Sequence, residues 1–179
     1  MTEIAPVEVS MYVAARPGDV FSYFTDPARY VGWMGSEAVL EPVPGGEYRV
    51  RMSDGFAAAG SFVVVEAPHR VVFTWGFADD EAAARTKHQP GEAAGAGNGA
   101  DAGTGTGAGA SASASAMPAG STRVTVTLEA EDGGTRLTLR HENLPSAELR
   151  HGHDVAWNVY LPRLAIRAAG GDPGPDPHS

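Results

Sequence analysis

Residues 146–170 read SAELRHGHDVAWNVYLPRLAIRAAG, and this stretch decides the fold. Its apolar side chains and one histidine recur at the spacing of a single helix face, namely Leu149, His153, Ala156, Trp157, Tyr160, Leu161 and Leu164. Ser146 is a favourable N-cap, and Gly170 with the glycine and proline that follow it ends the helix. The sequence therefore predicts one long amphipathic helix near the C-terminus.

Strand patterns precede this helix. They occur at about 7–13, 36–43, 47–52, 57–66, 71–77, 124–129 and 137–141, separated by Gly-, Asp- and Pro-containing turns. In the strand at 57–66 the inward face cannot be assigned, because 62–65 is apolar throughout. Two short helices are predicted after the first strand, one at 17–24 and one that begins at Asp26-Pro27.

An apolar helix face and an apolar sheet face must cover each other, because neither is stable in water. The predicted fold class is therefore α+β, with a curved antiparallel sheet wrapped around one long C-terminal helix. A sheet curled around a helix leaves a concave space between them, where a small molecule could bind.

Composition narrows the class of protein. The chain has 179 residues, a formal net charge of −9 and no cysteine. This charge disfavours nucleic-acid binding and docking on an anionic membrane, and the lack of cysteine excludes disulfides and thiolate chemistry. Without a signal-peptide pattern or a long apolar span, a cytoplasmic location is expected. No oligomeric state follows from the sequence.

The segment from 79 to 120 differs in composition from the rest of the chain. Residues 91–116 are mostly Gly, Ala, Ser and Thr and include no apolar side chain larger than alanine. Such a segment buries too little surface to offset the entropy of ordering it. We predict a single domain over 1–170, interrupted by a disordered insertion at about 79–120 and followed by a flexible tail at 171–179.

The predicted inward faces gather large aromatic side chains and two histidines. As candidate ligand-binding residues we take Tyr48, Met52, Phe73, Trp75, His141, His153, Trp157 and Tyr160. Each aromatic residue is equally well explained as core packing. For His153, the simpler interpretation is a core histidine that makes one hydrogen bond, and a polar contact to a ligand is the alternative.

No catalytic, metal or cofactor site follows from these residues. His151 and His153 are two apart on a helix and point in different directions, so they cannot chelate one metal ion. His141 and His153 could serve as an acid–base pair near neutral pH, which keeps a catalytic role open. A nucleophile-elbow pattern is absent, so no catalytic residue is assigned.

Several short motifs, taken in order, resemble a known family. They are Thr25-Asp26-Pro27 with Trp33, the turn 44–48, the hairpin 66–75 with Gly60, the strand 133–139, and His153 with Ala156-Trp157. Their order is similar to the helix-grip fold of the START-like (SRPBCC) superfamily, and most similar to the family of the activator of the heat-shock-protein-90 ATPase. The likeness spans about 7–169 apart from the insertion. Ala156, where the family usually has glycine, departs from the pattern.

The resemblance implies a fold and a ligand space, without a shared catalytic set. The leading hypothesis is a protein that binds a small hydrophobic or amphipathic molecule between sheet and helix, with no cofactor. One alternative is an enzyme, such as a cyclase or hydrolase that uses His141 and His153. Another is a chaperone-associated interaction module, for which the sequence offers no evident exposed apolar stripe.

Overall fold

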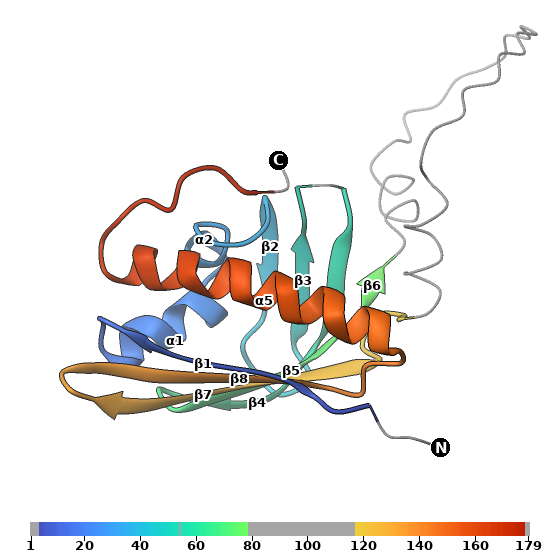
Figure 1. Cartoon of the computed structure of the whole chain (residues 1–179), viewed down its shortest axis with the longest axis horizontal. Helices are drawn as coiled ribbons and strands as arrows, with labels where there is room; N and C mark the ends of the chain where they lie inside the picture. The colour runs from blue at the N-terminus through green and yellow to red at the C-terminus, as the bar shows by residue number, and fades with distance from the viewer. Residues whose placement is uncertain (1–3, 54, 79–116, 178–179) are drawn as a thin grey trace, which may run out of the picture.

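The structure is a computed structural model that describes residues 4–53, 55–78 and 117–177. One long helix lies across a strongly curved antiparallel sheet (Figure 1). The strands are β1 (Val7–Val13), β2 (Glu37–Leu40), β3 (Glu47–Arg51), β4 (Ala57–Glu66), β5 (Arg70–Trp75), β6 (Phe77–Ala78), β7 (Thr122–Glu131) and β8 (Gly134–Glu142). The helices are α1 (Pro17–Thr25), α2 (Pro27–Tyr30) and α5 (Ala147–Ala168). The predicted α+β helix-grip fold is confirmed.

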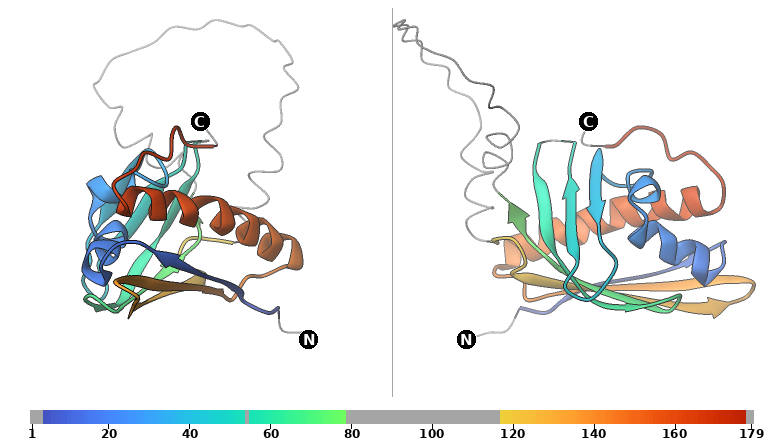
Figure 2. Two further views of the ribbon diagram at one scale, coloured as in Figure 1. Left: turned by 60° about the vertical axis from the view of Figure 1, so that its left-hand side comes forward. Right: turned by 180° about the vertical axis from the view of Figure 1, so that it is seen from behind.

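The strands follow the order β1-β8-β7-β5-β4-β3-β2, and β6 pairs with β4. One part of the sheet runs beneath α5, while β2 and β3 stand behind the helix in Figure 1 and in front of it in the right-hand view of Figure 2, so the sheet curls around the helix. Helices α1 and α2 cover one end of this arrangement. No helix in the described ranges combines the length and apolar character that crossing a membrane requires.

The strand register places His141 on the inward sheet face near the end of β8. His141 lies opposite Val7 of β1 on one side and opposite Val124 of β7 on the other. The tight turn between β7 and β8 fixes this register, because Asp132 and Gly133 both have positive φ, as short hairpin turns require. The predicted inward phase of Leu137, Leu139 and His141 is confirmed, since all three are buried.

Strand β4 shows why its inward face could not be assigned from the sequence. The pairing of β4 with β5 shifts in register between Phe62 and Val64. An irregularity of this kind changes which side chains face inward along one strand. Ala58 and Phe62 are buried, whereas Val63, Val64 and Val65 are only half-buried.

Helix α5 begins and ends as the sequence predicts. The side chain of Ser146 accepts a hydrogen bond from the backbone N–H of Leu149, and Gly170 has a φ of +87° after the last turn. The buried residues of α5 are those of the predicted stripe, namely His153, Trp157, Tyr160, Leu161 and Leu164. The outer face of α5 carries a set of exposed apolar side chains that the sequence analysis overlooked, namely Val155, Val159 and Ile166.

Residues 79–116, the greater part of the predicted insertion, lie outside the described residues. The predicted insertion boundary at residue 120 is corrected by the contacts of 117–120. Met117 is buried, its carbonyl accepts a hydrogen bond from Phe77 N at 2.8 Å, and Gly120 N donates to Ala59 O at 3.0 Å. Met117 supplies the large apolar side chain that the preceding Gly- and Ala-rich stretch lacks.

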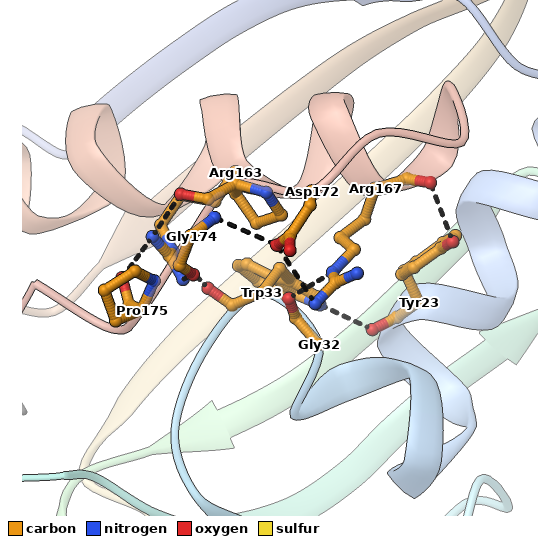
Figure 3. A network of polar contacts seen from close by, with 9 residues as sticks. Tyr23, Gly32, Trp33, Arg163, Arg167, Asp172, Gly174 and Pro175 are labelled. Carbon is orange, nitrogen blue, oxygen red and sulfur yellow. Dashed lines mark hydrogen bonds and ion pairs between the residues drawn. The ribbon is translucent and has the colours of Figure 1, made fainter.

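The segment after α5, expected to be a flexible tail at 171–179, makes defined contacts over 172–176, and Figure 3 shows those of Asp172, Gly174 and Pro175. The Arg163 guanidinium donates to the carbonyls of Pro173, Gly174 and Pro175, and its Nε donates to Trp33 O. Asp176 accepts hydrogen bonds from Gly35 N and from the Tyr160 hydroxyl. Residues 178–179 lie outside the described residues.

Replacing Arg163 with methionine is expected to lower the free energy of unfolding by about 1 kcal/mol, since it removes several partly exposed hydrogen bonds. It should also speed amide hydrogen exchange at Gly35, because the Gly35 N–H donates a hydrogen bond to Asp176 in the tail. Arg140→Met is the matched control, because the contacts of Arg140 among the described residues are exposed ion pairs, whose loss has little effect. Equal exchange at Gly35 in both variants would show that Arg163 does not hold the tail.

Candidate functional site

The candidate residues come from β3, β5, β8 and α5, the elements that face one another across the interior. All of them are buried except Met52. Met52 lies one residue beyond β3 and is half-buried, because the chain turns there, with Met52 N donating to Phe56 O. Met52 nevertheless packs against the buried core, so its place among the candidate ligand-binding residues stays a prediction.

Tyr48 and Phe73 form the aromatic floor on the sheet side. Their rings stack with centroids 4.2 Å apart and an interplanar angle of 13°. The Tyr48 hydroxyl shares a buried hydrogen bond with Tyr30 of α2. Burial raises the pKa of both phenols, so both stay protonated at neutral pH. The two tyrosines therefore carry no charge, and Tyr48 is closely packed against Phe73.

Next to this floor, two tryptophans and two histidines meet between the sheet and α5. We call Trp75, His141, His153 and Trp157 the Trp–His cluster. The ring centroids of Trp75 and Trp157 are 5.6 Å apart, and those of the two histidines 4.9 Å. Trp75 also lies 5.8 Å from Tyr48, which joins the cluster to the aromatic floor.

A chain of hydrogen bonds fixes the protonation of His141. The indole N–H of Trp157 can only donate, and it lies 3.1 Å from His141 Nδ1, so Nδ1 is the acceptor. Nε2 then carries the ring proton and donates to the Thr122 hydroxyl at 2.8 Å. The hydroxyl in turn donates to the Trp75 carbonyl, also at 2.8 Å. Both ring nitrogens of His141 therefore make hydrogen bonds to other side chains of the protein.

Burial keeps both histidines neutral. Loss of hydration, reinforced by His153, lowers the pKa of His141 to about 3. Burial also lowers the pKa of His153, against the opposing effect of its hydrogen bond to Leu149 O. A histidine with such a low pKa and no free nitrogen is a poor general base at neutral pH. The geometry of His141 thus favours a structural role over an acid–base one.

Among the described residues, His153 has a hydrogen-bond partner at only one of its two ring nitrogens. Its Nδ1 lies 2.8 Å from the Leu149 carbonyl, which only accepts, so Nδ1 carries the proton. Nε2 of this neutral ring is an acceptor and makes no hydrogen bond to any residue the structure describes. Phe77 packs against the His153 ring, with ring centroids 6.0 Å apart.

Trp75 contributes an unpaired donor to the cluster. Among the buried side-chain nitrogen and oxygen atoms of the described residues, Trp75 Nε1 alone has no hydrogen-bond partner. Its ring centroid is 6.4 Å from that of His153, and the two rings are perpendicular. Trp33 and Trp157, by contrast, donate to Tyr23 O and His141 Nδ1. Trp75 is therefore the tryptophan with unused polar capacity.

Tyr160 is buried, but its hydroxyl points away from the Trp–His cluster toward the tail, where it donates to Asp176 at 3.0 Å. Three further residues contact the candidate residues and were not among those proposed from the sequence, namely Thr122, Phe77 and Asp176. Thr122 has the same inward phase as Val124 and Val126, and a polar residue in that phase is a usable signal. In the described ranges, no three His, Cys, Asp or Glu side chains gather closely enough to hold a metal ion.

With this geometry established, comparison with known proteins identifies the family. A sequence model of the Activator of Hsp90 ATPase homolog 1-like proteins matches residues 14–169. The chain belongs to this family. Among curated protein sequences, none matches the chain.

Solved structures agree with membership of the Activator of Hsp90 ATPase homolog 1-like family. The AHSA1-like protein RHE_CH02687 from Rhizobium etli is 36% identical, with a TM-score of 0.61, and 98% of this chain and 92% of that chain are covered. DynU16, a putative protein in the dynemicin biosynthetic locus, is 21% identical with a TM-score of 0.65. The alignment with DynU16 covers 95% of this chain and 49% of that one, so the chain spans about half of DynU16.

A third structure extends the same likeness. The Aha1 dimer from Colwellia psychrerythraea is 14% identical with a TM-score of 0.62, and 92% of this chain and 96% of that chain are covered. At this identity the similarity shows the shared fold alone.

Proposed function

We propose that the protein binds a small hydrophobic or amphipathic molecule between the sheet and α5, without a defined catalytic activity. The observation that carries this proposal is the Trp–His cluster, an aromatic surface buried between the two layers. Apolar sites with a few placed polar groups are typical of small-molecule binding. Both histidines are neutral, so the polar groups would orient a ligand rather than exchange protons with it.

Native mass spectrometry of the purified protein, followed by denaturation and identification of released molecules, tests this proposal. We expect a co-purifying compound, or a rise in melting temperature with some member of a panel of lipids, aromatic acids and polyketide-like compounds. Ligands that bind only the folded protein raise its stability. Finding neither a bound compound nor any shift in melting temperature would contradict the proposal.

Two matched variants locate the site. Ala156 lies on the inward face of α5 and is half-buried, whereas the neighbouring Val155 is exposed. Ala156→Leu should weaken binding by filling space beside Trp157, and Val155→Leu should leave binding unchanged. The reverse pattern would favour an interaction module that works through the outer face of α5.

A further inference from the structure

The polar groups of the Trp–His cluster restrict the chemistry of a ligand. The indole N–H of Trp157 and both nitrogens of His141 already have partners. Two groups remain, the N–H of Trp75, which can only donate, and Nε2 of neutral His153, which can only accept. A buried donor without an acceptor is uncommon, because it loses hydration without replacement.

A neutral hydroxyl group matches this pair, since its oxygen accepts one hydrogen bond while its hydrogen is donated in another. The rings that bear the two groups are neighbours, with centroids 6.4 Å apart and perpendicular planes. The rings packed against Trp75 and His153 are Tyr48, Phe77, His141 and Trp157. None of them carries a charge that would neutralise an ionic ligand.

We propose that Trp75 Nε1 and His153 Nε2 together anchor the hydroxyl group of an otherwise apolar ligand, such as a phenol or an alcohol. This inference rests on the proposed function and specifies the ligand class of the same site. Trp75 Nε1 donates to the hydroxyl oxygen, and the hydroxyl hydrogen is donated to His153 Nε2. Carboxylates and ammonium ions bind poorly, because the site offers no opposite charge and desolvating an ion is costly.

Three aromatic probes of similar shape test the anchor by calorimetry. 2-Naphthol accepts and donates, 2-methoxynaphthalene only accepts, and 2-methylnaphthalene does neither. We expect wild-type protein to bind 2-naphthol about tenfold more tightly than 2-methylnaphthalene, with the ether in between, because each added hydrogen bond has a modest net effect. Trp75→Phe should remove the advantage of the ether over 2-methylnaphthalene and reduce that of 2-naphthol, and His153→Leu should remove the advantage of 2-naphthol over the ether.

A measurement on the wild-type protein avoids dependence on how the variants fold. The chain has three tryptophans, so its NMR spectrum should show three indole N–H signals. The indole N–H groups of Trp33 and Trp157 already donate hydrogen bonds in the structure. Adding 2-naphthol should shift the Trp75 signal downfield further than 2-methylnaphthalene does, because only the naphthol accepts a hydrogen bond. The ring currents of the two probes are alike, so the difference between the two shifts reports that hydrogen bond.

The outcomes separate the two proposals. Equal affinities for the three probes, with no extra shift at Trp75, would overturn the hydroxyl anchor and leave the proposed function standing. Failure of all three probes to bind would count against the proposed function itself as well as the anchor. Tighter binding of 2-naphthoate than of 2-naphthol would show that the site selects anions, which also overturns the anchor.

Discussion

Replacing His141 with leucine is expected to lower the free energy of unfolding by about 3 kcal/mol, although leucine fits the apolar surroundings of this buried position. The cause is the hydrogen bonding on both sides of the ring. Leucine would leave the Trp157 indole N–H without its acceptor and the Thr122 hydroxyl without its donor, both in the interior. Each buried polar group left unsatisfied costs about 1–3 kcal/mol.

The matched control is His141→Gln. A glutamine amide offers an acceptor oxygen and a donor NH₂ group at a spacing close to that of the two imidazole nitrogens. It can therefore accept a hydrogen bond from Trp157 and donate one to Thr122, as neutral histidine does. Denaturant unfolding should place His141→Gln between wild type and His141→Leu. If leucine were tolerated as well as glutamine, the hydrogen-bonded chain through His141 would have no structural importance.

Acidification is expected to destabilise the fold well before most carboxylates titrate. The pKa of His141 is about 3 in the folded chain and near 6.5 when unfolded, so the unfolded chain binds more protons between these values. Stability is therefore complete above pH 6.5 and falls as the pH drops toward 3. For His141 alone the loss reaches about 2 kcal/mol at pH 5. The lowered pKa of His153 acts in the same direction.

Urea unfolding at several pH values between 7 and 5 measures this dependence. His141→Gln provides the control, because glutamine does not titrate and should flatten the slope while keeping the fold. The hydrogen bond from Arg136 lowers the pKa of the partly exposed Glu131 carboxyl, so the titration of Glu131 affects stability only in more acid solutions. A wild-type stability that is constant from pH 7 to 5 would contradict the assignment of His141 as a neutral buried histidine.

Much of the fold follows from periodicity alone. The spacing of side chains along 149–164 predicts both α5 and its buried face, because a helix can bury only one stripe against a sheet. The alternation at 137–141 likewise predicts that His141 points inward. These properties depend on neighbours in sequence, so a single chain is enough to reveal them.

The polar connections were not predictable in the same way. The bond between His141 and Thr122 joins neighbouring strands, and its direction depends on the acceptor role that Trp157 imposes on the ring. Similarly, Arg163 holds the tail through backbone carbonyls, which every residue carries and which leave no sequence signature. A Pro- and Gly-rich segment then resembles a flexible tail even where it makes contacts.

The location of a bound small molecule tests the central claim most directly. Intermolecular nuclear Overhauser effects should be recorded between 2-naphthol and the protein's side-chain protons. If the ligand binds between the sheet and α5, contacts should appear to Trp75, His153 and Trp157. Contacts confined to Val155, Val159 and Ile166 on the exposed outer face of α5 would contradict the claim.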